Sequence, residues 1–358
     1  MSPIPLFASS LEDYHERLTE ALGRVVPTEH FILGPEVRAF EEEFAAYLGV
    51  RHCVGVANGT DALAIALRAL GVGGGDEVVV PSFTFYATAE AVAGIGARPV
   101  FCDVDPETFC VTRETVERAL TPTTKAVVPV HLFGNVAPVP ELRELGPPVL
   151  EDSAQAAGAA LRGVKAGALG DAATFSFFPS KNLPCLGDGG AVVTDDDEVA
   201  ARVRRLRFHG SEDKVTFVEV GYNSRLDELQ AAALRVLLPE LDGWNDRRRA
   251  VAEAYGQEGL SELAAAPRPA DGAEHVYHLY VVRHERADEL AAALGERGIG
   301  ARGYYRVPVH RQPGMAGYTA DELPGTEEAA RTHLALPMGP LLTRDQVREV
   351  VRGLASLP

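Results

Sequence analysis

Between residues 51 and 195, short runs rich in β-branched and aromatic residues alternate with segments whose apolar residues recur at helical spacing. The runs that predict strands are His52–Val56, Glu77–Val80, Pro99–Asp103, Ala126–Val130, Val149–Asp152, Ala173–Phe177 and Ala191–Thr194. Between the first two, Leu63, Ala66, Leu67 and Leu70 fall on one face of a helix. This alternation is typical of βαβ units, so we expect an α/β fold with a mostly parallel, seven-stranded sheet.

The pattern changes after residue 226. Leu226–Glu258 is rich in Ala, Leu, Glu and Arg and predicts one or two long helices. The runs that follow predict strands at Tyr277–Arg283 and Ala301–Tyr305 and helices at Ala287–Arg297 and Thr343–Leu354, a small α+β unit. Because single cores stop growing near ~250–300 residues, we expect two domains: a large one over residues 1–240, which includes the N-terminal segment, and a small one over 241–358.

Composition narrows the class of protein. Apolar residues make up 46% and charged residues 24%, as in an ordinary globular protein. The net charge of −17 disfavours nucleic acid and anionic membranes as partners. The first residues show no basic leader before an apolar run, and no stretch of ~18 apolar residues occurs, so we expect a cytoplasmic protein. Four cysteines without a C-x-x-C pair or a nearby His predict neither a metal site nor disulfides.

The segment Asn58–Leu63 lies between a predicted strand and a predicted helix. Gly59 permits a tight turn there, and the amides of Thr60 and Asp61 would be unpaired donors at a helix N-terminus, where the helix dipole favours a phosphate. The alternative is an ordinary N-cap, in which Thr60 or Asp61 satisfies those amides. The segment by itself leaves both interpretations open.

Glu151 and Asp152 follow the apolar run Pro148–Leu150. A carboxylate at the carboxyl end of a parallel strand lies where open α/β sheets bind ligands, so Asp152 is a candidate functional residue. Glu151 is expected to point to the opposite face of the sheet. An acidic pair in this position can also be no more than a helix cap.

Lys181 follows the aromatic stretch Ser176–Phe178 and precedes the glycine cluster Gly187–Gly190. We expect it in a cleft, where partial desolvation lowers the pKa of its amine and makes it nucleophilic. The three segments together supply a helix N-terminus for a phosphate, a carboxylate for a pyridinium nitrogen and an amine for an aldehyde. A site for pyridoxal 5′-phosphate (PLP) requires these three groups.

These motifs, with Gly221–Leu226 and Leu336–Met338, resemble those of the DegT/DnrJ/EryC1/StrS sugar aminotransferases over nearly the whole chain. The resemblance implies the fold-type I aminotransferase architecture and a homodimer with two shared active sites. It also implies a transaminase of amino-sugar biosynthesis, which moves an amino group from an amino acid, usually L-glutamate, to a nucleotide-linked keto-sugar.

The resemblance also implies roles for individual residues. Lys181 would hold PLP covalently, Asp152 would pair with its ring nitrogen, and Gln155 would bond near its phenolic oxygen. The residues implied around the cofactor phosphate and ring are Gly59, Thr60, Asp61, Ser176, Phe85 and, from the partner subunit, Asn223; those implied near the substrate are His131, Arg225, Tyr305 and His310. For Phe85 a core aromatic, and for the two histidines a structural role, are the alternatives.

Two short segments bear on the position of the keto group and on the specificity for the sugar. Asn58–Ala62 resembles members that act on 3-keto sugars more than the Ser/Ala/Thr-rich segment of 4-keto enzymes, so we expect amino transfer at C-3, with C-4 as the alternative. Tyr304-Tyr305-Arg306 stands where many relatives read His-Tyr-Pro, so sugar specificity cannot be carried over from that loop.

The resemblance leaves three alternatives: a dehydratase, a cofactor-binding sensor, and another fold-type I enzyme such as an aldolase or a desulfurase. A dehydratase would carry histidine at the Schiff-base position, which holds Lys181 here. A PLP-binding sensor without turnover would be favoured by an appended DNA-binding segment or by loss of the Lys, Asp or Gln, and the sequence has neither feature. A desulfurase, unlike an aldolase, needs a reactive cysteine, whereas Cys185 has the pattern of a packing residue.

Overall fold

The computed structural model describes residues 3–318 and 320–356, and its large unit is built on seven strands. They form two ladders, ordered β1 (His52–Val56), β9 (Gly190–Thr194), β8 (Ala172–Ser176), β5 (Leu150–Asp152) and β3 (Arg98–Cys102), β2 (Glu77–Pro81), β4 (Thr124–Val127). Parallel bridges from Val127 to Val149 and from Val130 to Asp152 join the ladders. The α/β class is confirmed, and each predicted strand overlaps an observed one, although the seven are not assigned to one continuous ladder.

The strand directions bring several chain segments to one edge of these ladders. β1 and β8 each run antiparallel to β9 and therefore parallel to each other, and β5 is parallel to β8. β3 and β4 are parallel to β2. The carboxyl ends of β1, β2, β5 and β8 consequently share one edge, where Asn58, Asp152 and Ser176 lie.

Helices cover both faces of the strands. Val192 packs in the cluster that holds Ala66 of α3 (Gly59–Ala69), whereas its neighbour Val193 packs with Phe44 of α2 (Pro35–Leu48) on the other face. Strands that are buried on both faces explain the nearly continuous apolar runs of the sequence. The remaining helices of this unit are α1 (His15–Val25), α4 (Ala87–Gly94), α5 (Arg113–Ala119), α6 (Val139–Arg143), α7 (Asp197–Leu206) and α8 (Glu228–Leu237).

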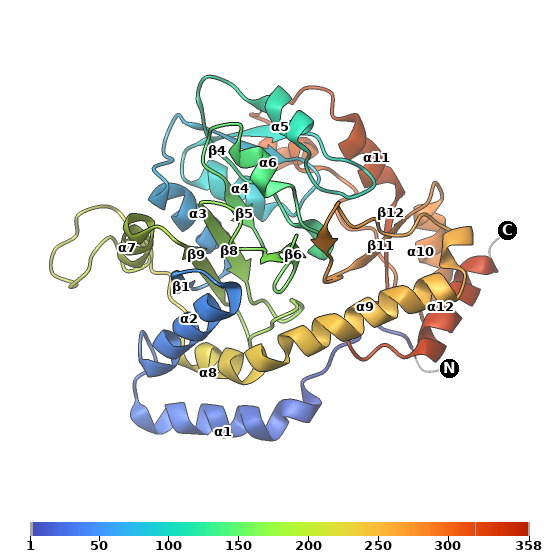
Figure 1. Cartoon of the computed structure of the whole chain (residues 1–358), viewed down its shortest axis with the longest axis horizontal. Coiled ribbons are helices and arrows are strands. Elements are labelled where there is room, and N and C mark those ends of the chain that lie inside the picture. Colours follow the sequence, from blue (N-terminus) through green and yellow to red (C-terminus); the bar gives the residue numbers. More distant parts are fainter. Residues whose placement is uncertain (1–2, 319, 357–358) are drawn as a thin grey trace.

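The helix α9 (Leu241–Gln257) runs along the underside of the molecule, from α8 to α12 (Figure 1). Around its far end lie α10 (Ala287–Glu296) and α12 (Arg344–Ala355), with β11 (Tyr280–Arg283) and β12 (His333–Leu336) above them in this view and α11 (Pro324–Thr332) above the strands. Residues 4–8 join this unit: Ile4 bridges to Ile299, and Phe7 bridges to Met338. A domain boundary between residues 240 and 241 stays a prediction.

Short elements complete the chain. β6 (Ala160–Leu161), β7 (Val164–Lys165) and β10 (Ala273–Glu274) form a small antiparallel ladder. The 3₁₀ turns are η1 (Glu12–Tyr14), η2 (Val26–Thr28), η3 (Leu132–Gly134), η4 (Leu238–Glu240), η5 (Leu260–Glu262), η6 (Val309–Arg311) and η7 (Pro313–Met315).

The predicted strand Ala301–Tyr305 is wrong. Only Arg302 makes an isolated bridge, to Ala335, and Tyr305 has a φ of 49°, which no strand residue adopts. The strand predicted from residue 277 begins at Tyr280 for the same reason, since Tyr277 has a φ of 45°. A left-handed residue interrupts the extended backbone, so no strand forms through Tyr305, and the strand β11 starts only after Tyr277.

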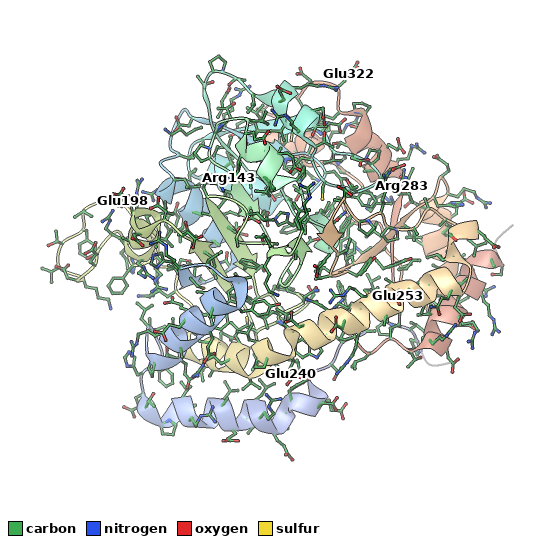
Figure 2. All side chains as sticks on the ribbon, in the orientation of Figure 1. Arg143, Glu198, Glu240, Glu253, Arg283 and Glu322 are labelled. Carbon is green, nitrogen blue, oxygen red and sulfur yellow. The ribbon has the colours of Figure 1, made fainter. Side chains whose placement is uncertain are left out.

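The charged side chains lie mainly at the surface. Glu198 and Glu322, both exposed, mark the periphery in Figure 2. The four cysteines are free and buried. In the described part of the chain, no helix has the length and apolar character to cross a membrane, and no three His, Cys, Asp or Glu side chains gather as a metal site would require.

Candidate active site

A cavity of about 1120 Å³ opens at the shared carboxyl edge of the strands. The residues from the sequence prediction that line it are Gly59, Thr60, Asp61, Phe85, Asp152, Gln155, Ser176, Lys181 and Tyr305. They come from the ends of β1, β2, β5 and β8 and from the loop before η6. A cavity of this size has room for a cofactor together with a second ligand.

The start of α3 forms one end of the cavity. The Asn58 side chain is its N-cap, with Oδ1 accepting the Asp61 N–H at 2.8 Å. Gly59 and Thr60 are the first helical residues, whose N–H groups have no acceptor within a helix. A Cβ on Gly59 would lie 2.8 Å from the Cβ of Ser176, so only glycine allows this close packing. The capping and phosphate-binding interpretations are therefore compatible, because the cap is Asn58 rather than Thr60 or Asp61.

Asp152 is the last residue of β5 and is only 5% exposed. Its Oδ2 accepts a hydrogen bond from Thr88 Oγ1 at 2.9 Å, and its Oδ1 accepts one from the Ala154 N–H at 3.2 Å. Burial raises the pKa of this carboxyl, while the two hydrogen bonds and the charge of Lys181 oppose the shift. A cationic ring nitrogen beside it would favour the ionised carboxylate further.

Lys181 lines the same cavity, in the loop that follows β8. Burial lowers the pKa of its amine to about 8, although the charge of Asp152 opposes the shift. An exposed lysine has a pKa of ~10.4. A far larger fraction of the Lys181 amine is thus neutral, and therefore nucleophilic, near neutral pH.

This pKa gives a prediction for pH dependence. The protonated amine cannot attack an aldehyde, so the rate at which cofactor-free protein bonds pyridoxal at Lys181 should rise about tenfold per pH unit up to about pH 8 and then level off. Borohydride trapping followed by peptide mass mapping measures that rate at Lys181. A rate that keeps rising to pH 10 would contradict the lowered pKa.

An aromatic wall with an amide forms another side of the cavity. The Gln155 Oε1 accepts the Phe133 N–H at 2.7 Å, and its Nε2 donates to the Tyr305 hydroxyl at 3.1 Å. The Tyr305 ring stacks on Phe133 at 6.0 Å between centroids. Phe85 is 58% exposed and lines the cavity, so it offers an apolar face to a ligand instead of packing in the core.

The structure does not bring His131 to the cavity. Its ring is fully buried; Nδ1 accepts the Ala137 N–H at 3.0 Å, so Nε2 carries the proton toward the Glu151 carboxylate at 2.8 Å. Glu151, on the face opposite Asp152, also accepts the N–H groups of Gly167, Leu169 and Gly170. In this structure His131 belongs to a hydrogen-bonded network behind the site.

Three other predicted residues also lie outside the cavity lining. His310 Nδ1 is 2.6 Å from Ser82 Oγ, and its Nε2 is 3.4 Å from Glu327, while its neighbour Val309 does line the cavity. Asn223 and Arg225 are hydrogen-bonded to each other on the loop between α7 and α8. The resemblance assigns Asn223 to the site of the partner subunit, and within its own chain it lies on this loop, outside the cavity lining.

Several side chains at the cavity were missing from the prediction, among them Thr88, Arg302 and His278. Thr88 fixes Asp152, and Arg302 lies at the cavity with its guanidinium 5.2 Å from the centre of the Tyr304 ring. His278 lines the cavity, and burial lowers its pKa well below the ordinary range, so its ring is neutral. Of these three, only Thr88 had a sequence signal, its position just after the segment Phe83–Tyr86 at the start of α4.

Cys185 lacks the properties of a catalytic thiol. Burial raises its pKa to about 11, and its Sγ lies 3.1 Å from the Gly187 carbonyl oxygen. A nucleophilic cysteine needs a lowered pKa and an exposed sulfur. This environment disfavours a desulfurase.

Comparison with known proteins identifies the family. The model of the DegT/DnrJ/EryC1/StrS aminotransferase family matches residues 12–355. A dTDP-3-amino-3,4,6-trideoxy-alpha-D-glucose transaminase from Streptomyces venezuelae is 47% identical, with 96% of this chain and 92% of that protein covered. A protein from Geobacillus stearothermophilus named pleiotropic regulatory protein is 44% identical, with 99% and 98% covered.

A solved structure agrees with these relatives. The crystal structure of DesV from S. venezuelae, in complex with a ketimine intermediate, superimposes with a TM-score of 0.95 at 45% identity and covers 99% of this chain and 98% of that one. The fold-type I architecture expected from the sequence is thereby confirmed. The chain belongs to the DegT/DnrJ/EryC1/StrS family of PLP-dependent aminotransferases.

Proposed function

We propose that this enzyme transfers an amino group from an amino acid, L-glutamate, to C-3 of a nucleotide-linked keto-sugar. The observation that carries the proposal is that Lys181, Asp152 and the N-terminus of α3 line one cavity of about 1120 Å³. The 3-amino sugar in the name of the S. venezuelae relative supports C-3, as does the resemblance of Asn58–Ala62 to 3-keto enzymes.

The residues present fit PLP. Gly59 packs closely against Ser176, so the unpaired N–H groups at the start of α3 and the Ser176 hydroxyl are available to bind a phosphate. Asp152 can pair with a ring nitrogen. When bound, PLP would act as an electron sink: its ring takes up the electron pair of the Cα–H bond of the donor when the proton departs. Asp152 would pair with the ring nitrogen and favour its protonated form. Lys181 would hold the cofactor and, when its amine is free, would move a proton as general base and acid, for which a pKa of about 8 is suited.

The proposal includes a homodimer. The loop between α7 and α8, which carries Asn223, also exposes Val215, Phe217, Val218 and Val220, by 58–82%. Several exposed apolar side chains on one loop are typical of an interaction site. We place this loop against the cavity of a second chain, where Asn223 and Arg225 would meet phosphates. Light scattering should then give twice the mass of one chain.

The proposal also includes a cytoplasmic location and the absence of a nucleic-acid partner. The net charge of −17 supports the second of these, because it repels a phosphate backbone.

The experiment is amino transfer from L-glutamate to TDP- and UDP-linked 3-keto and 4-keto sugars, with products identified by mass and NMR. We expect a preference for 3-keto sugars of at least about tenfold in kcat/KM. Turnover of 4-keto sugars alone would support the alternative regiochemistry. Cofactor binding without turnover on any sugar would favour a regulatory protein, as the name of the Geobacillus relative describes.

A further inference from the structure

Arg248, in the middle of α9, is a buried cation without a carboxylate partner in the described part of the chain. Its side chain is 4% exposed; Nη1 donates to the Tyr277 carbonyl oxygen at 3.1 Å, and Nε has no hydrogen-bond partner among the described residues. Arg207, comparably buried, instead pairs with Glu41 at 2.6 Å. Because buried charges are normally paired, Arg248 indicates that its partner is a ligand.

Arg248 lines a second cavity, of about 150 Å³. Lys181, Asn182, Trp244, Ser9 and Ser10 line it too. At ~30 Å³ per water molecule, the space would hold about five waters, so it suits a small polar group. Lys181 also lines the large cavity, so a ligand bound here would lie beside the reactive amine.

The charge of this second cavity favours an anion. Lys181 and Arg248 both face it, and its lining contains no acidic side chain. Burial lowers the pKa of Arg248 to about 10, which leaves the guanidinium protonated at neutral pH. The nearby His278 donates from Nδ1 to Asn182 and is kept neutral by burial and by these two cations.

The walls of the second cavity come from distant parts of the chain. Residues 4–8 pair with Gly298, Gly300 and Met338 and thereby hold Ser9 and Ser10 in place. The two serines add polar residues to the lining, and the Ser10 Oγ accepts the Glu12 N–H at 3.0 Å.

We propose that the second cavity binds a carboxylate of the amino-acid donor, with Arg248 as its ion-pair partner. The inference rests on the proposed function, because it takes the donor to be an amino acid. A planar guanidinium matches a carboxylate through paired N–H groups, and such charge-assisted hydrogen bonds are the strong ones. Arg248 thus holds the donor beside Lys181 in the first half of the reaction, and the sugar occupies the large cavity in the second half, after the 2-oxo acid has left.

The test uses Trp244, the only tryptophan of the chain, as a reporter inside this cavity. Holoenzyme is titrated with glutarate, a dicarboxylate that cannot donate an amino group, and Trp244 fluorescence is followed. We expect saturable binding to the native enzyme and about 30- to 100-fold weaker binding to Arg248→Met, because a charged hydrogen-bond partner is lost. The exposed neighbour Arg247 provides the matched control, and Arg247→Met should bind like the native enzyme.

Two further readouts separate a binding role from a structural one. Removal of an unpaired buried charge should leave the thermal midpoint of Arg248→Met unchanged or higher, and the KM for L-glutamate should rise more than kcat falls. A lower midpoint with unchanged glutarate affinity would overturn the inference. If the native enzyme binds glutarate through Arg248 but never accepts an amino group, the proposed function fails and the carboxylate site stands; if it turns over but glutarate leaves Trp244 unaffected, the inference alone fails.

Discussion

Replacement of Lys181 by alanine should abolish amino transfer, with a fall in kcat of at least about 10⁴-fold. The variant loses both the covalent attachment of the cofactor and the group that moves the proton, and general acid–base catalysis alone contributes up to ~10⁴-fold. The visible absorption band of the lysine-linked cofactor should disappear as well.

Absorption spectra and turnover of the purified variant measure both effects. Lys125 is the matched control, because it is one of four lysines and its side chain is exposed at β4. Lys125→Ala should keep the native spectrum and rate. An unchanged visible band in Lys181→Ala would remove Lys181 from its assigned role.

Replacement of Asp152 by asparagine should separate cofactor binding from catalysis. The phosphate end of the site and Lys181 are untouched, so the cofactor should remain bound with its visible band. A neutral amide cannot hold a proton on the ring nitrogen, so the electron sink weakens, and we expect kcat to fall on the order of 10³-fold.

Cofactor content and kcat measured on the same preparation test this separation. The conservative control is Thr88→Ser, which keeps the hydroxyl that donates to Asp152 at 2.9 Å and should retain most activity. If Asp152→Asn keeps full turnover, or if it loses the cofactor entirely, the assignment of Asp152 as the partner of the ring nitrogen is wrong.

The strands and the order of the site motifs could be predicted from the sequence because both depend on local patterns. Runs rich in β-branched and aromatic residues predicted the bounds of β1, β2 and β8 closely. Asp152 and Lys181 were candidates because each follows a predicted strand. These two side chains line one cavity because parallel strands bring their carboxyl ends to a common edge.

Other features depended on contacts that the sequence does not reveal. The left-handed conformation of Tyr305, at a non-glycine residue, broke a strand that the apolar pattern predicted. His131 stands near a strand end as Asp152 does, but its ring turns to the opposite face, where the Glu151 carboxylate accepts a hydrogen bond from its Nε2. Arg248 is one of three consecutive arginines in α9, and only tertiary packing decides which of them is buried.

The pairing of residues 4–8 with Met338 also determines how late in synthesis the chain can finish folding. The segment leaves the ribosome early, yet its partner lies roughly 330 residues later, on the order of 15 to 70 s at ~5–20 residues per second. Until then, Ser9 and Ser10 have no fixed position over the second cavity. A nascent chain can therefore fold its central strands first, but the pocket around Arg248 closes only once Met338 and Pro340 have emerged.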